Sequence, residues 1–124
     1  MKPLAESTIV VERSRFFAVL LEADQVEEIN RFIKGQKRKY RKACHHVWAC
    51  RLKPDEDAAV FEQARDDGEV GRPGHVLLGE LQRVDFFGAL VVSRIFGGVK
   101  LGPGGVSRAF RQAAREVLSL HQGK

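Results

Sequence analysis

This chain of 124 residues has little of what would mark a secreted or membrane protein. It contains only two cysteines, and no apolar run approaches the roughly 20 residues that a membrane-spanning helix needs. Its first residues, MKPLAEST, contain no apolar core of a signal peptide. These absences predict a cytoplasmic protein that does not associate with a membrane.

The cysteines, Cys44 and Cys50, form a single C-x5-C pair, which is not the spacing of a zinc site. If the segment between them is a strand, ~3.3 Å per residue places them about 20 Å apart. A disulfide requires Cα atoms within about 7 Å of each other. We therefore expect reduced thiols, and the sequence indicates neither a metal nor a cofactor.

The composition is that of an ordinary globular domain. Apolar residues make up 44% of the chain and charged residues 30%, and we find no repeat and no low-complexity linker. A chain of this length buries about two-thirds of the surface that its unfolded form exposes. The sequence predicts one domain over residues 1–124.

Charge is unevenly distributed along the chain, whose formal net charge is +5. The stretch Lys34–Lys42 (KGQKRKYRK), which includes Lys37, Arg38 and Lys39, holds six positive charges in nine residues. Residues 52–87 are acidic overall, and residues 88–124 are basic. Clustered positive charge favours anionic partners such as RNA, DNA, phosphates or acidic proteins.

Apolar periodicity predicts strands alternating with helices, and hence an α/β or α+β sandwich in which helices pack on one sheet. Asp24 is the expected N-cap of the first helix, with Glu27 completing a capping box. Residues 58–64 fit either a strand or a helix. The expected strands are 8–12, 15–21, 46–51 and 89–96, and the expected helices are 25–37, 75–84 and 105–120.

A glycine-rich turn between a buried strand and the last helix is the strongest functional pattern, reading RIFGGVKLGPGGVSR over residues 94–108. Glycine permits close approach of a ligand to the backbone, and a helix N-terminus attracts anions. Neither a Walker A loop nor a Rossmann fingerprint is present. Alternatively, the glycines only permit a tight turn and the arginines form a solvated face. The candidate anion-binding residues here are Gly97, Gly98, Lys100, Gly102, Gly104, Gly105, Arg108, Arg111 and Arg115.

Two further clusters contain groups that could take part in chemistry. The turn Asp66-Asp67-Gly68-Glu69 could bind a divalent cation or act in acid–base catalysis, although a solvated turn is the simpler interpretation. In Cys44-His45-His46, alternate residues of a strand share a face, so Cys44 and His46 could form a nucleophile pair.

Arg94 lies inside an otherwise apolar strand, where an unpaired charge would be costly. It should therefore reach the end of the strand or a carboxylate, and Asp66, Asp67 and Glu69 are the candidate partners.

Several of these motifs resemble those of the family that contains the IMPACT N-terminal-type domain and the bacterial YigZ proteins. The resemblance extends from about Arg13 to Leu118, and its most specific block is R-[FY]-F-G-G-x-K-L-G, which includes Arg94 and Phe96. His45 lies in the block that resembles A-T-H-N-C-Y-A-Y-R. The matching blocks are residues 13–16 (RSRF), 43–51 (ACHHVWACR), 66–69 (DDGE), 91–102 (VVSRIFGGVKLG) and 104–110 (GGVSRAF).

This resemblance implies a fold similar to the second domain of ribosomal protein S5, a mixed four-stranded sheet with helices packed on one face. Eukaryotic members restrain the kinase that shuts down translation on amino-acid starvation, and nucleic-acid binding is suggested for bacterial members. We expect a stand-alone binding protein whose partner is RNA, the ribosome or a translation-associated protein. The alternative is an enzyme or small-ligand protein that binds a phosphorylated metabolite at the glycine-rich turn.

The chain departs from the family pattern in two respects. After Glu69 the family reads P-x-G-T-A-G-x-P, but here only Val70-Gly71-Arg72-Pro73 follows, so the loop is shortened. We also expect that the additional domains of IMPACT and YigZ are absent, so the kinase-regulating role does not transfer intact.

Overall fold

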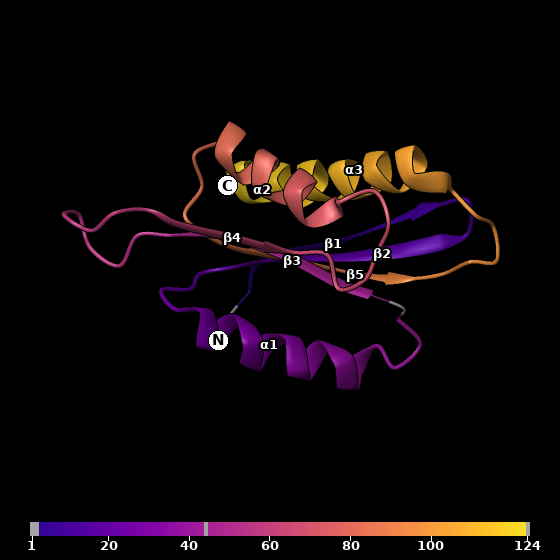
Figure 1. Ribbon diagram of the computed structural model, residues 1–124, viewed down its shortest axis with the longest axis horizontal. Helices are drawn as coiled ribbons and strands as arrows, with labels where there is room; N and C mark the ends of the chain where they lie inside the picture. Colours follow the sequence, from indigo (N-terminus) through magenta and orange to yellow (C-terminus); the bar gives the residue numbers. More distant parts are fainter. Residues whose placement is uncertain (1–2, 44, 124) are drawn as a thin grey trace.

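A computed structural model describes residues 3–43 and 45–123, and its strands form one antiparallel sheet in the order β1-β2-β5-β3-β4. Figure 1 shows this sheet as the middle layer of the molecule, with helices above and below it. The elements are β1 (Pro3–Val11), β2 (Ser14–Leu21), α1 (Val26–Lys39), β3 (His45–Leu52), β4 (Phe61–Arg65), α2 (Pro73–Arg83), β5 (Gly88–Ile95) and α3 (Gly102–Gln122).

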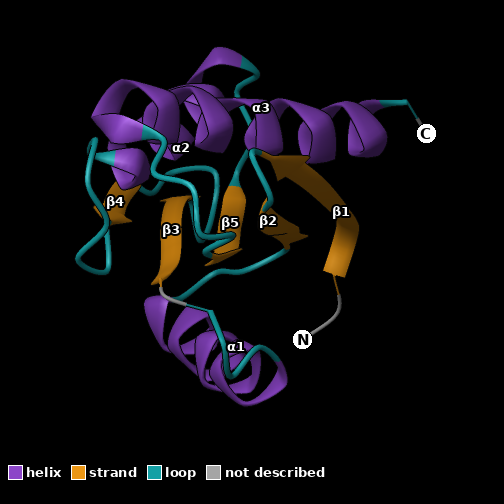
Figure 2. Ribbon diagram, turned by 90° about the vertical axis from the view of Figure 1, so that its right-hand side faces the viewer, coloured by secondary structure: helices purple, strands orange, loops and turns teal. Residues whose placement is uncertain are grey.

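The expected α+β class is confirmed, but the expected sheet differs from the observed one in three respects. The sheet has five strands rather than four, because residues 61–65 form β4, and every pairing is antiparallel rather than mixed. Helices α2 and α3 cover one face and α1 covers the other, so the helices do not share a face (Figure 2).

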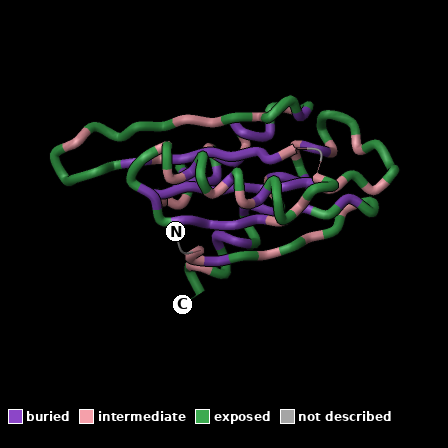
Figure 3. The backbone as a smooth tube through the Cα atoms, turned by 90° about the horizontal axis from the view of Figure 1, so that it is seen from below, coloured by how far each residue is buried: buried purple, intermediate pink, exposed green. Residues whose placement is uncertain are grey.

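Two apolar layers hold the sandwich together, one on each face of the sheet. Phe16, Leu20 and Val92 face α2 and α3, whereas Val91 and Trp48 face α1. This division follows from the alternation of side chains along each strand. The central strand β5 is buried over most of its length, as its nearly continuous apolar sequence predicted. Figure 3 shows buried residues concentrated in the middle of the molecule, whereas the loops at its two ends are largely exposed.

The first helix begins one residue later than expected, and a different residue caps it. Gln25 rather than Asp24 is the N-cap, and Glu28 rather than Glu27 is the partner that reaches back. The Glu28 carboxylate accepts hydrogen bonds from the backbone N–H groups of Asp24 at 3.0 Å and Gln25 at 3.2 Å. The helix extends two residues beyond its expected end at residue 37, so Lys37, Arg38 and Lys39 all lie in its last turn, where positive charge complements the helix dipole.

The last helix begins three residues earlier than predicted, at Gly102, so Gly104 and Gly105 belong to its first turn rather than to a loop. Within the described residues, no helix has the length and apolar character required to span a bilayer. Cys50 is buried with a free thiol, whose pKa burial raises. Cys44 lies outside the described residues, so the possibility that it forms a nucleophile pair with His46 is not tested.

Candidate nucleic-acid interface

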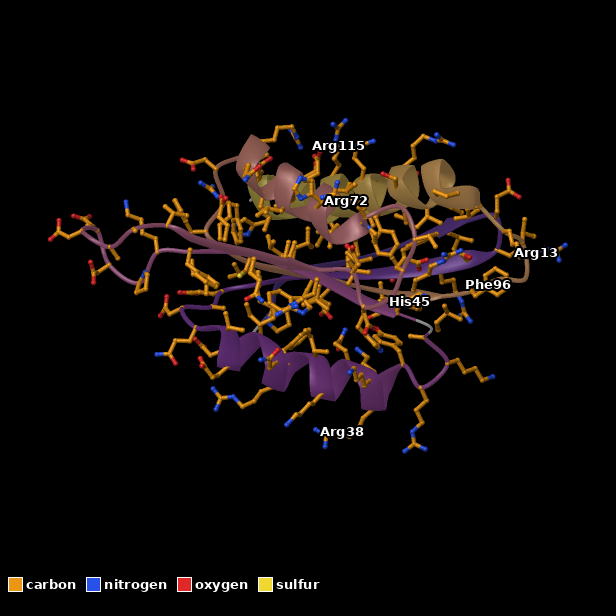
Figure 4. All side chains as sticks on the ribbon, viewed as in Figure 1. Arg13, Arg38, His45, Arg72, Phe96 and Arg115 are labelled. Carbon is orange, nitrogen blue, oxygen red and sulfur yellow. The ribbon has the colours of Figure 1, made fainter. Side chains whose placement is uncertain are left out.

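The family motifs converge at one end of the sheet, which we call the motif end and define as residues 12–14, 45–46, 66–71 and 94–101. Figure 4 shows Arg13, His45 and Phe96 at this end. Hydrogen bonds join these segments across long distances in sequence, including one between Ser14 and Arg94. Motifs that are separate in the sequence therefore form one structural unit.

A buried ion pair lies at the centre of the motif end. Arg94 Nη1 donates to Glu69 Oε2 at 3.1 Å, and both side chains are more than nine-tenths buried. The guanidinium also lies over two aromatic rings, 5.5 Å from the centroid of Phe16 and 5.7 Å from that of Phe96. Arg94 Nε has no hydrogen-bond partner among the described residues, so these rings provide its remaining electrostatic contacts.

Ser14 connects the ion pair to the glycine-rich turn. Its hydroxyl oxygen accepts hydrogen bonds from Arg94 Nη2 at 3.3 Å and from the backbone N–H of Gly97 at 3.2 Å. The backbone of Gly97 passes so close to that of Arg13 that any side chain at position 97 would collide with the Arg13 carbonyl group. Glycine at position 97 is therefore required by the packing of two turns.

The acidic loop uses its carboxylates for structural hydrogen bonds. Asp66 Oδ1 accepts from the backbone N–H of Gly74 at 2.8 Å, which caps the start of α2. Asp67 Oδ2 accepts from the backbone N–H of His46 at 2.7 Å, which fixes the loop to β3. With Glu69 paired to Arg94, each carboxylate of the D-D-G-E motif makes a structural contact, so the motif is more than a solvated turn. The described residues contain no metal-binding cluster of His, Cys, Asp and Glu.

The two histidines that begin β3 have different environments. His45 Nδ1 donates to the carbonyl oxygen of Asp67 at 2.7 Å, and its Nε2 lies 3.8 Å from Glu69 Oε2. His46 Nδ1 lies 2.7 Å from the hydroxyl oxygen of Ser93, and both residues are buried. Burial lowers the pKa of His46, and nearby Lys37 also lowers it, although Asp67 acts in the opposite direction. His46 is therefore neutral at pH 7.

The groups that could have formed an enzyme site line two different cavities. Lys100 and Arg108 line a cavity of about 500 Å³ with residues of β1 and α3. Asp66 and Asp67 line another, of about 490 Å³, beneath α1, which His46 also lines. The acidic groups and Lys100 thus do not converge on either cavity.

The arginines of α3 lie along one groove, but two of them are already paired. Arg108, Arg111 and Arg115 line this groove on the outer side of α3. Glu80 of α2 accepts from Arg115 Nε at 3.0 Å and lies 4.0 Å from Arg111 Nε. Arg83 Nε also donates to Glu80, at 2.8 Å. This cluster connects the two helices and reduces the positive charge available to a ligand.

The basic stretch Lys34–Lys42 lies on the opposite side of the sheet. Figure 4 shows Arg38 projecting away from the sheet on the α1 side and Arg115 on the α3 side. Lys37, Arg38 and Lys39 are exposed, and no ion pair within 4 Å joins them to another residue of the described chain. The two groups of candidate anion-binding cations therefore lie on two different surfaces.

Sequence reasoning missed an aromatic stack at the end of α1. The rings of Phe17 on β2 and Tyr40 after α1 lie 4.3 Å apart and nearly parallel, at 16°. Tyr40 lies three residues beyond the expected end of the first helix, and the sequence gave no partner for it. Ser14 and Ser93 were also missed, because small polar residues inside strands carry no distinctive sequence pattern.

Comparison with known proteins identifies the family. The sequence profile of the Impact N-terminal domain matches residues 12–118. The chain belongs to this family. It is 33% identical over 121 residues to the IMPACT family member YvyE of Bacillus subtilis, covering 96% of this chain and 54% of that protein. It is 32% identical over 123 residues to YigZ of Escherichia coli, covering 94% and 58% respectively.

The relatives include eukaryotic proteins and a translational regulator of known structure. Protein IMPACT-B of Xenopus tropicalis is 33% identical over 99 residues, which cover 77% of this chain and 31% of that protein. The structure of the two-domain translational regulator Yih1 superposes with a TM-score of 0.63 at 29% identity, covering 96% of this chain and 46% of Yih1. The crystal structure of a hypothetical protein superposes with a TM-score of 0.84 at 27% identity, covering 93% and 56%.

The chain spans about half the length of the bacterial relatives it matches. The family profile matches residues 12–118, which include every residue of the motif end.

Proposed function

We propose that this chain is an RNA-binding module linked to translation, and that the basic end of α1 holds the phosphate backbone. One observation carries the proposal: the cations of Lys34–Lys42 form a dense, exposed cluster with no ion pair among the described residues, whereas Arg51, Arg83 and Arg94 each pair with a carboxylate. Unpaired, clustered cations provide the sequence-independent attraction that dominates nucleic-acid binding. The link to translation rests on the similarity to Yih1.

The glycine-rich turn offers a second anion site in this proposal. No side chain of the described chain caps the N-terminus of α3, and its first turn contains no acidic residue. The backbone N–H groups there therefore remain available to a phosphate, with Lys100 and Arg108 beside them. A ribose-phosphate chain could contact this turn and the basic end of α1 only by passing around the motif end.

The proposal is tested by fluorescence anisotropy with a labelled RNA at low salt. We expect the double variant Arg38→Gln/Lys39→Gln to bind RNA at least tenfold more weakly than the unmodified chain. The control Lys53→Gln/Arg72→Gln removes two exposed positive charges outside Lys34–Lys42 and should retain most of the affinity. Equal losses in the two variants would show that net charge rather than the α1 surface holds RNA.

A small phosphorylated ligand is a second candidate, favoured by the cavity of about 500 Å³ at Lys100 and Arg108. A thermal-shift screen of phosphorylated metabolites tests it, because a ligand at 100 times its dissociation constant stabilises the fold by about 2.7 kcal/mol. The stabilisation should disappear in Lys100→Gln if the ligand occupies this cavity.

A further inference from the structure

We propose that the ligand is single-stranded RNA, and that its bases stack on Tyr40 and lie over the part of the α1-side face that α1 leaves uncovered. This inference rests on the proposed function and specifies the ligand of the same surface. It follows from the coverage of the sheet, the aromatic stack and the placement of the surrounding cations.

The α1 side of the sheet is covered only in part. Helix α1 packs on β3 and β5, whereas edge strand β1 extends beyond the helix (Figure 2). On β1, Ile9 and Val11 pack against the core on the α3 side, so the alternating residues Thr8 and Val10 face the α1 side. Both are exposed, and Val10 is 64% exposed. An uncovered sheet face therefore lies beside the basic end of α1.

The Phe17–Tyr40 stack forms the boundary between the covered and uncovered parts of this face. Phe17 is fixed within the sheet, where it pairs with Thr8 on one side and Ser93 on the other. Two backbone hydrogen bonds hold Tyr40 in place. Its N–H donates to the Gln36 carbonyl at 2.8 Å, and the Tyr40 carbonyl accepts from the Ala43 N–H at 3.0 Å. Two parallel rings in a fixed position provide a platform on which a nucleobase adds a third ring.

Cations surround the platform at positions suited to phosphates. Lys39 Nζ lies over the Tyr40 ring, 5.2 Å from its centroid, and exposed Arg41 follows directly in the chain. Because Phe17 occupies the other face of the ring, a base that stacks on Tyr40 takes the place of the Lys39 ammonium, which then moves to an adjacent phosphate. Exposed Arg15 pairs with Val10 across the sheet, on the uncovered face. A polymer that carries both negative charges and aromatic rings would match the cations and the aromatic stack together. Nucleic acid has both, which favours it over an acidic peptide.

The strand must be single for this arrangement to work. In a duplex, each base stacks between its neighbours and offers no ring face to a protein, whereas an unpaired strand can place its bases on aromatic side chains. Stacking is tolerant of sequence, because every base has a ring face. The surface should therefore prefer single strands without strong selection among bases.

The test compares one labelled RNA as a single strand and as a duplex, with variants at Tyr40. We expect the single strand to bind more tightly than the duplex. Tyr40→Leu should weaken single-strand binding about five- to tenfold and leave duplex binding and the salt slope unchanged, because no charge is removed. Tyr40→Phe retains the ring and should bind as the unmodified chain does. The control Phe61→Leu removes an exposed aromatic ring of β4 and should have no effect.

The outcomes separate this inference from the proposed function. If no RNA binds at low salt, both are wrong. If Arg38→Gln/Lys39→Gln loses binding but Tyr40→Leu does not, or if the duplex binds at least as tightly as the single strand, only the stacking inference is wrong. If polyglutamate binds with the same dependence on Tyr40, the occupant is an acidic protein and the RNA assignment is overturned.

A second readout protects the test from a folding defect in Tyr40→Leu. Ultraviolet cross-linking of the single strand to the unmodified chain, followed by mass spectrometry, should place adducts on peptides that contain Tyr40 or Phe17. Adducts confined to peptides of α3 would overturn the inference.

Discussion

Arg94 Nη1 and Glu69 Oε2 lie 3.1 Å apart in the interior of the protein, joining the central strand β5 to the acidic loop. The pair explains how an arginine can occupy a strand that is otherwise apolar and buried on both faces. Its neighbours Ser14 and Phe96 extend the contact to the first hairpin and to the glycine-rich turn. Two sequence motifs that are 25 residues apart thus stabilise each other.

Breaking this pair from one side should be strongly destabilising. Arg94→Met leaves the Glu69 carboxylate buried without its cation, and we expect the free energy of unfolding to fall by about 3–5 kcal/mol. Chemical denaturation of the variant measures this loss, and anion binding at the turn should weaken in parallel. The double variant Arg94→Met/Glu69→Leu should recover part of the stability. An unchanged melting temperature and unchanged binding in Arg94→Met would show that the Arg94–Glu69 pair does not stabilise the acidic loop and the glycine-rich turn.

The two adjacent glycines of the turn should respond differently to alanine. At Gly97 a Cβ would collide with the backbone of Arg13, so Gly97→Ala should cost about 3 kcal/mol or more. Gly98 has a φ of +88° and open space around it, so Gly98→Ala should cost only about 1 kcal/mol from backbone strain. Thermal melts of the two variants decide between these values, and equal losses would contradict the close packing of the two turns.

Glu80 should contribute stability at neutral pH that disappears in acid. Burial acts to raise the pKa of this carboxyl, but hydrogen bonds from Arg115 and Arg83 outweigh it and hold the pKa below its usual range. The contribution is therefore present above the unfolded pKa of about 4.3 and is lost as pH falls through the lower folded value.

At pH 7, we expect Glu80→Gln to lower the free energy of unfolding by about 1–2 kcal/mol, since its arginine partners are about half exposed. The difference from the unmodified chain should shrink below pH 4. Glu116→Gln, at an exposed position of α3, provides the matched control. A constant difference across this pH range would show that Glu80 acts through packing alone.

His46 should make the fold less stable as pH decreases below neutrality. Because burial lowers its pKa, the folded state binds a proton less readily than the unfolded chain does. Its stabilising contribution is complete above the unfolded pKa of about 6.5 and is lost as pH falls through the folded pKa. Replacement by asparagine should flatten this decline, and His75→Asn, at an exposed position of α2, should not. Parallel curves for His46→Asn and the unmodified chain would count against the assignment.

Much of the fold could be predicted from local sequence patterns. The apolar run of β5 and the stripe of α3 indicated their elements because each pattern repeats with the period of its structure. Residues 58–64 were ambiguous between strand and helix, because β4, which begins within this range, is short and lies at the edge of the sheet, so its burial pattern is weak. The placement of α1 on the opposite face could not be predicted, because an amphipathic helix identifies its apolar side but not the face it covers.

The candidate site was predictable where its contacts follow from burial and charge. A charged residue in a buried strand requires a partner, so Arg94 predicted an acidic neighbour, which the structure identifies as Glu69. The division of the cations into two surfaces was not predictable, since charge along a sequence does not specify a side of the sheet. The position of Tyr40 depends on the exact end of α1, which sequence patterns locate only to within a few residues.

The salt dependence of RNA binding tests the central claim most directly. If Arg38 and Lys39 each neutralise a phosphate, their replacement by glutamine should reduce the slope of log affinity against log salt by about 1.4 for a single strand. The control Lys53→Gln/Arg72→Gln should leave the slope unchanged. Titrations at several salt concentrations between about 50 and 200 mM measure both slopes. The expected change follows because a single strand releases ~0.7 counterions per phosphate contact. An unchanged slope in Arg38→Gln/Lys39→Gln would contradict the account, because these cations would then not contact the RNA.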